Sequence, residues 1–323
     1  MLKFARMVLR KGFAALKTQG VSGSLDIAFR YFVPRHLACY EQCSALFQGK
    51  IGLEIGGPSG KFRWNGLLPI YTVAARIDNC NFGDKTTWEG CITEGATFHF
   101  DKRRRPGNQY VAEATHLSQI MPASYDFVLS SHTLEHIANP LKALSEWTRV
   151  LKENGLLVLV LPHKDGTFDH RRPRTTLAHC IQDFEQQITE ADLTHLEEIL
   201  RLHDLTKDPG AGDFESFKQR SKQNLENRCL HHHVFDTSLA VELVHHIGLQ
   251  IFAVEVFKPY DIFVVARKPT RGQEVRNEKF RGIDTVPCWH SPFPSDHCHP
   301  MSSMAFSPKF SITSLRSTRG CKA

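Results

Sequence analysis

Short apolar segments alternate with amphipathic segments between residues 51 and 162, a pattern typical of a parallel sheet covered by helices on both faces. Leu156–Leu161 is almost wholly apolar and predicts a central strand. Pro140–Leu151 repeats its apolar residues at helical spacing and is followed by Asn154-Gly155, which favours the end of a helix. Four earlier apolar segments also predict strands: Ile51–Ile55, Tyr71–Ile77, Gln109–Ala112 and Tyr125–Ser130.

Two further strands are predicted at Leu249–Val256 and Ile262–Ala266. Only residues 257–261 separate them, whereas a parallel crossover needs about a dozen residues or more. The two strands must therefore pair in the antiparallel sense. Together these segments predict an α/β fold in which a mainly parallel sheet ends in an antiparallel hairpin.

The chain divides into three predicted parts. Residues 1–48 form a basic helical extension, residues 49–268 form the α/β domain, and residues 269–323 form a disordered tail rich in Ser, Pro, His and Cys. Within the domain, residues 163–248 are too long for an ordinary connection, so we expect a lid or substrate insertion there. The insertion includes a predicted helix, Glu190–His203, capped by Thr189.

Composition limits the class of protein. The chain has 323 residues, of which 41% are hydrophobic, so it can bury a core. No apolar run approaches the roughly 18 residues that span a bilayer, and the start of the chain does not read as a secretory signal. The nine cysteines are scattered without a CxxC pair, which favours a reducing compartment. We therefore expect a cytoplasmic protein.

The net charge of +6 is unevenly distributed. Residues 1–25 carry +5 and residues 269–323 carry +4, which leaves −3 on the rest. A nucleic-acid-binding face would place its basic excess on the folded domain, so we expect no nucleic-acid partner. Residues 1–20 can form a helix with one basic face, which fits weak contact with a membrane surface, a transit peptide, or a helix solvated on its basic side.

The turn Glu54–Gly60 follows the first predicted strand and has the spacing ExGxxxG. Glycine at a strand end lets a ligand approach the backbone, but this spacing does not fit the dinucleotide fingerprint GxGxxG. Asp78 follows the second predicted strand, where a carboxylate can accept hydrogen bonds from a ribose diol. Glu54 could accept a hydrogen bond from an ammonium group and favour a cationic ligand.

Three segments together resemble the type 11 branch of the class I S-adenosyl-L-methionine (SAM)-dependent methyltransferases. They are Glu54–Gly60, Tyr125–His136 (YDFVLSSHTLEH) and Arg149–Gly155 (RVLKENG), and the resemblance covers about residues 51–162. It implies a Rossmann-like sheet with a terminal antiparallel hairpin, SAM as the cofactor, and methyl transfer as the activity. A large helical lid insertion would complete this fold class.

The resemblance also implies which residues bind SAM. Gly56, Gly57 and Gly60 would line its methionyl and ribose part together with Glu54, and Asp78 would hold the ribose. The remaining predicted contacts flank the adenine or pass beneath the sulfonium: Glu113, Ala114 and Leu117, then Ser130 and His132. The chain departs from the family pattern at three points: Pro58 replaces a glycine, His116 replaces a common aspartate, and the first helix is shortened.

Methyl transfer to a hydroxyl requires an aligned acceptor and a group that removes its proton. Histidine suits this role near neutral pH. By resemblance to sugar O-methyltransferases, His136 is the predicted base and Asp165 its partner, with His163 as a further catalytic candidate and His132 as another possible base.

The insertion is polar and contains arginines, which favours a polar small molecule or a sugar or glycan precursor as the acceptor. His195 and Glu198 share a helical face, but the histidine-rich insertion lacks clear ligand spacing, so no metal site is predicted. A SAM-binding protein without catalysis is the alternative. An RNA methyltransferase is disfavoured by the acidic core and by the absence of an amino-methylation motif after the fourth strand.

Overall fold

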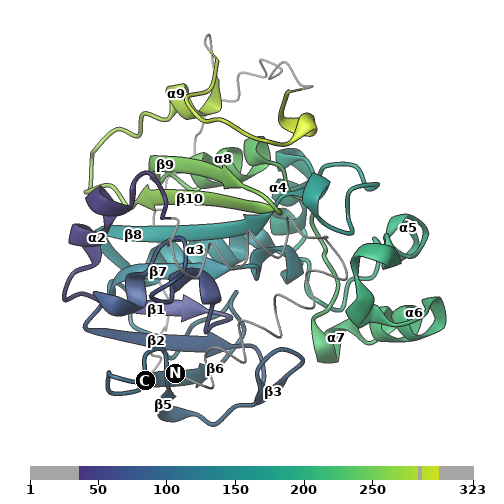
Figure 1. The fold of residues 1–323 in the computed structure, drawn as a ribbon, viewed down its shortest axis with the longest axis horizontal. Coiled ribbons are helices and arrows are strands. Elements are labelled where there is room, and N and C mark those ends of the chain that lie inside the picture. The colour runs from purple at the N-terminus through teal and green to yellow at the C-terminus, as the bar shows by residue number, and fades with distance from the viewer. Residues whose placement is uncertain (1–35, 283–285, 298–323) are drawn as a thin grey trace, which may run out of the picture.

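The structure, a computed structural model, describes residues 36–282 and 286–297. The predicted basic helix at 1–20 and the last part of the predicted tail lie outside these ranges. An eight-stranded sheet runs through the domain in the order β5-β6-β2-β1-β7-β8-β10-β9 (Figure 1). Its strands are β1 (Ile51–Ile55), β2 (Arg76–Asn81), β5 (Gly95–Phe98), β6 (Gly107–Val111), β7 (Tyr125–Ser131), β8 (Leu151–Pro162), β9 (Gln250–Phe257) and β10 (Asp261–Arg267).

The predicted fold class is confirmed. Strand β1 pairs in parallel with β2 and β7, and β8 continues the parallel part beside β7. Strand β10 is antiparallel to both β8 and β9, so the terminal hairpin has the expected sense. A short separate pair, β3 (Lys85–Thr86) and β4 (Gly90–Cys91), follows β2.

The second strand lies later in the chain than its apolar pattern predicts. Residues Ile70–Thr72 form a 3₁₀ turn whose Ile70 and Tyr71 are buried, and β2 begins only at Arg76. The prediction of a strand at Tyr71–Ile77 is therefore wrong, because its apolar residues pack as a turn beneath the sheet. Strand β2 continues to Asn81, which places Asp78 in its middle opposite Leu53.

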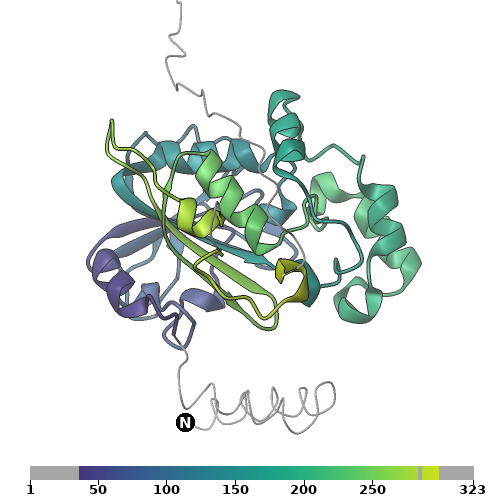
Figure 2. The same cartoon turned by 90° about the horizontal axis from the view of Figure 1, so that it is seen from above.

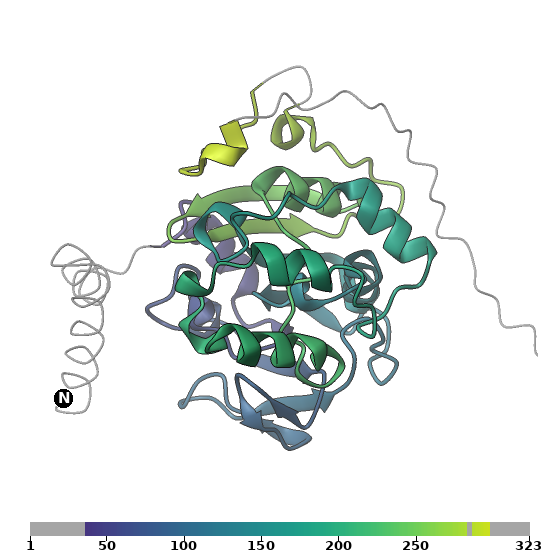
Figure 3. The same cartoon turned by 90° about the vertical axis from the view of Figure 1, so that its right-hand side faces the viewer.

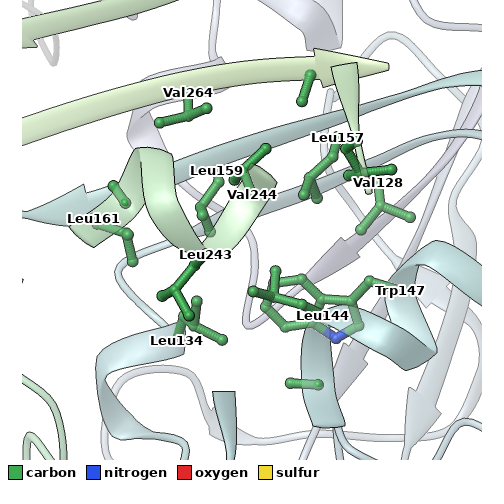
Figure 4. Close-up of a cluster of buried hydrophobic side chains, with 14 of the residues drawn as sticks. Val128, Leu134, Leu144, Trp147, Leu157, Leu159, Leu161, Leu243, Val244 and Val264 are labelled. Atoms are coloured by element: carbon green, nitrogen blue, oxygen red, sulfur yellow. The ribbon is translucent and has the colours of Figure 1, made fainter. Parts of the chain in front are cut away.

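Helices cover both faces of the sheet. On one face, α3 (Pro140–Val150) and α8 (Thr237–His246) pack Leu144, Trp147, Leu243 and Val244 against β7, β8 and β10 (Figure 4). On the other face, α2 (Tyr40–Phe47) buries Cys43 and Phe47. The folded domain therefore includes residues that the sequence assigned to the extension 1–48.

The insertion after β8 contains α4 (Leu177–Glu185), α5 (Leu196–Leu202), α6 (Phe214–Lys222) and α7 (Asn224–Asn227). Helices α5, α6 and α7 gather at one end of the sheet (Figures 1 and 3). Helix α8, inside the predicted insertion range, covers the sheet instead. The predicted helix Glu190–His203 is too long, since 190–195 form turns before α5.

Part of the predicted disordered tail is folded, so that prediction is wrong for residues 269–282 and 286–297. This segment includes α9 (Glu278–Arg281), and it runs beside α8 and the hairpin (Figure 2). Phe280, Trp289 and Phe293 are buried. The Trp289 indole donates to the Phe280 carbonyl at 2.8 Å. A few large apolar side chains thus anchor a segment whose overall composition resembles a disordered one.

Among the described residues, no helix is both long and apolar enough to cross a membrane.

Candidate functional site

A cavity of about 450 Å³ lies at the carboxyl ends of the parallel strands, between the sheet and the insertion. Ligands of open α/β sheets bind at this edge. Its lining residues come from the ends of four strands and from the insertion: Gly56, Ser59, Asn81, Ala112, Glu113, Ala114, Ser131, His132, Glu135, His136, Glu190, Lys207, Arg228 and His231. Trp88 and Tyr260 add aromatic walls.

Glu54 organises the glycine turn from beneath it. The side chain is fully buried, accepts a hydrogen bond from the Tyr71 hydroxyl at 2.6 Å, and accepts another from the Ser59 amide at 2.9 Å. Burial raises the pKa of Glu54 to about 7, although both hydrogen bonds oppose this shift. Glu54 does not line the cavity, so its predicted direct contact with SAM is replaced by a supporting role.

Only Gly56 among the three predicted glycines lines the cavity. Its φ of +76° is unfavourable for other residues, and a Cβ there would lie 2.4 Å from the Thr133 hydroxyl oxygen. Gly57 is fixed below the surface, since Asn79 accepts from its amide at 3.0 Å and donates to its carbonyl at 3.2 Å. Gly60 has open space around it.

Asp78 does not reach the cavity. It is buried in the middle of β2, where its carboxylate accepts hydrogen bonds from the Asn108 amide at 2.8 Å and the Tyr125 hydroxyl at 2.9 Å. Arg76 lies beside the same carboxylate at 3.1 Å. The prediction of Asp78 as the ribose ligand is therefore wrong, because β2 extends three residues further. Asn81 ends the strand and lines the cavity.

The predicted adenine contacts divide into two groups. Glu113 and Ala114 line the cavity, and Arg228 of the insertion forms an ion pair with Glu113 across it. Leu117 is buried in the hydrophobic core and does not line the cavity, which corrects its predicted role. Arg228 also pairs with Glu190 at 3.0 Å, so one cation links this edge of the sheet to the insertion.

His132 lies at the end of β7 between two carboxylates. Its Nε2 atom is 2.9 Å from Asp261 and its Nδ1 atom is 3.6 Å from Glu135. Asp261 also pairs with Lys61. Although burial opposes it, these two carboxylates raise the pKa of His132 to about 9. His132 is thus a cation at neutral pH and cannot accept a proton there. Ser130, predicted beside it, is buried and does not line the cavity.

Replacing His132 with glutamine is expected to lower the melting temperature most at low pH. The pKa of His132 is raised from 6.5 to about 9, so its stabilisation is complete below pH 6.5 and is lost as the pH rises through about 9. Calorimetric scans between pH 6 and pH 10 should show the melting temperatures of the two proteins converging. A constant difference across this range would contradict the raised pKa of His132.

His136 and His231 face one another in the cavity. Their ring centroids are 4.6 Å apart, and their ligand-type atoms and a Glu135 oxygen all lie within 4.8 Å of one another. His136 Nδ1 is 3.1 Å from the Leu230 carbonyl, which only a protonated nitrogen can bond. Burial, followed by the charge of His231, lowers the pKa of His136 to about 4.

His231 forms a hydrogen-bonded pair with Asp169, joined through its Nδ1 atom. Arg172 supports this pair, since it donates to Asp169 at 3.0 Å and to the His231 carbonyl at 2.8 Å. Burial opposes ionisation, but His231 and Arg172 hold the pKa of Asp169 at about 2. A permanently ionised carboxylate therefore fixes the orientation of the imidazole, leaving its Nε2 atom toward other groups of the site.

The other two predicted catalytic residues lie away from the cavity lining. Asp165 accepts a hydrogen bond from the Ser295 amide at 2.9 Å. His163 lies 3.1 Å from Asp296 and stacks on Phe293, with ring centroids 4.1 Å apart. Both side chains thus contact residues 286–297 instead of the cavity, so the predicted pairing of His136 with Asp165 is wrong.

Residues 93–159 match the model of the family described as "Methyltransferase domain". Over these residues the chain contains a methyltransferase domain. It is accordingly an enzyme that uses SAM, and the match includes β7, α3 and most of β8. The alternative of a non-catalytic binding protein is set aside.

Several solved structures resemble the methyltransferase domain. A SAM-dependent methyltransferase from Aquifex aeolicus has 13% identity, covers 71% of this chain and 87% of its own, and has a TM-score of 0.36. A putative methyltransferase from Bacillus halodurans has 13% identity, coverages of 72% and 98%, and a TM-score of 0.40. One from Mesorhizobium loti has 14% identity, the same coverages and a TM-score of 0.40. No curated protein sequence matches the chain.

Two residues of the site were not predicted from the sequence. Asp169 and His231 both lie in the histidine-rich insertion, 62 positions apart. The sequence showed them only as parts of Phe168-Asp-His-Arg-Arg and His231-His-His. The histidines and arginines around them were the available signal, but nothing in their spacing joined the two segments.

Proposed function

We propose that this methyltransferase transfers the methyl group of SAM to a hydroxyl of a polar small molecule, such as a sugar or a glycan precursor. The observation that carries this proposal is the Asp169–His231 pair, of which His231 lines the cavity beside His136. SAM supplies an electrophilic methyl group when bound. The enzyme must supply a proton acceptor and a site for the acceptor molecule.

The residues that would hold SAM lie at the strand ends. Gly56 exposes backbone to the cavity at a position where a Cβ would meet Thr133, which fits a ligand in close contact with the turn. Asn81 ends β2 and would take the ribose contact first expected of Asp78, and Glu113 and Ala114 line the cavity with it. The cavity volume of about 450 Å³ lies within the range of small-molecule sites.

In our proposal His231 replaces His136 as the general base. His231 Nε2 would take the hydroxyl proton of the acceptor, so that its oxygen can form the new bond to the methyl carbon. Asp169 would stabilise the resulting imidazolium, as the acidic member of a catalytic triad does. His136 remains neutral but is a weak base, because its pKa is about 4, and we assign it a positioning role.

The acceptor side of the cavity supports a polar substrate. Lys207, Glu190 and Arg228 bring charged groups from the insertion. Trp88 is 54% exposed, lines the cavity, and lies 5.0 Å from His136 between ring centroids. An aromatic surface bordered by hydrogen-bonding groups suits a sugar ring, which has apolar C–H faces and polar edges.

A panel assay tests the proposed substrate class. Purified enzyme is incubated with SAM and either sugars, uronic acids and nucleotide-sugars, or apolar phenols, and S-adenosylhomocysteine is quantified. We expect turnover with members of the polar set. Turnover confined to the apolar phenols would overturn the proposal.

Asn81→Ala is expected to weaken SAM binding about tenfold, as expected for the loss of one hydrogen-bonding side chain at the ribose. Titration calorimetry with SAM measures this change. Asp78→Ala is the matched comparison: it should lower the melting temperature, because Tyr125 and Asn108 lose their acceptor, with a smaller effect on SAM affinity. A larger loss of SAM affinity in Asp78→Ala than in Asn81→Ala would instead assign the ribose contact to Asp78.

A further inference from the structure

A second group of histidines converges away from the cavity. His179 and Asp183 lie one turn apart on α4, His195 stands directly before α5, and His233 lies between α7 and α8. None of the four lines the cavity. Three separate parts of the insertion thus bring side chains that can bind a metal close together. The proposed methyl transfer does not use any of them.

Two distances within this group, both measured from His179, are close to those between ligands of a single ion. His179 Nε2 is 3.0 Å from His195 Nε2 and 3.4 Å from Asp183 Oδ2. Ligands held at 2.0–2.1 Å in a tetrahedron lie about 3.3 Å apart. His233 offers a further nitrogen, since the ligand-type atoms of His179, Asp183 and His233 all fall within 4.8 Å of one another.

Two polar atoms of this group have no hydrogen bond. Asp183 Oδ2 and His233 Nδ1 are buried and have no hydrogen-bond partner among the described residues. The residues themselves are only 7% and 1% exposed. A buried polar atom without a partner costs roughly 1–3 kcal/mol, so two of them beside facing imidazole nitrogens point to an additional species at their centre.

The surroundings also suit metal ligation. His233 Nε2 lies 3.0 Å from the Ala138 carbonyl and 3.7 Å from Asp183 Oδ2, so the ring is held beside Asp183 and Nδ1 is its nitrogen without a hydrogen bond. Asn139 donates to the Asp183 carbonyl at 2.9 Å, which fixes the end of α4 beside α3.

We propose that His179, Asp183, His195 and His233 bind one transition-metal dication of the zinc type. Three imidazoles with one carboxylate favour such an ion over Mg²⁺ or Ca²⁺, which prefer oxygen ligands. Four protein ligands leave no open position for chemistry, so the ion is structural. It joins α4 and the start of α5 to the segment that carries His231.

Metal content tests this proposal on the full chain. Elemental analysis of protein purified with added Zn²⁺ and then dialysed should give about one zinc per chain. His179→Gln and His195→Gln should each lower Zn²⁺ affinity at least tenfold in a competition titration. His99→Gln, a change at an exposed histidine outside the group, is the matched control and should retain the metal.

Chelation supplies a second readout on the unaltered protein, which does not depend on whether a variant folds. A strong chelator should lower its melting temperature by several degrees, and Zn²⁺ should restore it. Protein that retains no zinc after dialysis and melts identically with chelator would overturn the metal site. SAM titration of the same samples separates this result from failure of the proposed function, which predicts SAM binding in either case.

Discussion

His231→Ala is expected to lower kcat by about 100-fold or more while leaving SAM affinity within about twofold. A positioned general base contributes factors of this size, and the imidazole lies on the acceptor side of the cavity, among residues of the insertion. Single-turnover kinetics with an accepted substrate from the polar panel measure the chemical step, and calorimetry measures SAM binding. Asp169→Asn should also lower kcat, because it removes the charge that stabilises the imidazolium.

The comparison with His136→Ala distinguishes the two candidate bases. If His231 is the base, His136→Ala should raise KM or lower kcat less than His231→Ala does. A larger loss of kcat in His136→Ala, with His231→Ala retaining most activity, would instead support the prediction from the sequence. His99→Ala serves as a control for the loss of an exposed histidine elsewhere on the domain.

Gly56→Ala is expected to weaken SAM binding more than tenfold. The new methyl group would meet the Thr133 hydroxyl at 2.4 Å, and the φ of +76° is itself unfavourable by about 1–2 kcal/mol for a residue with a Cβ. Because Gly56 lines the cavity and Thr133 starts the segment that leads to His136, the distortion reaches both halves of the site. Calorimetric titration with SAM measures the change.

Gly60→Ala is the matched control for Gly56→Ala. A Cβ at Gly60 meets no atom within 4 Å, and the residue does not have a positive φ. SAM affinity and melting temperature should therefore stay close to those of the unaltered enzyme. Equal losses in both variants would mean that the turn tolerates no side chain at all, and would remove the special role assigned to Gly56.

The sequence predicts the sheet well where local pattern determines the structure. Strand β1 has the predicted bounds, and the hairpin of β9 and β10 follows from a loop too short for a crossover. Strand β2 is the exception, because the apolar Tyr71 serves a buried turn rather than a strand. Because β2 ends at Asn81 rather than at Ile77, Asn81 and not Asp78 reaches the cavity.

The candidate site could be predicted only in part. Gly56, His132 and His136 belong to continuous motifs, and the structure places all three at the cavity. The pairing of Asp169 with His231 depends on how the insertion folds back over the sheet, which periodicity does not encode. The contacts of His163 and Asp165 with residues 286–297 likewise join segments distant in the sequence.

Asn277, in the segment after β10, blocks an edge of the sheet through which two copies of the chain could associate. Strand β9 is the last strand of the sheet, and such edges can pair with another chain. The Asn277 side chain accepts from the Ile251 amide at 2.8 Å and donates to the Leu249 carbonyl at 2.8 Å, so it occupies backbone groups that a foreign strand would need. A fragment ending at residue 268 would leave the edge of β9 open. A fragment that extends to residue 297 would keep Asn277 and its hydrogen bonds to this edge.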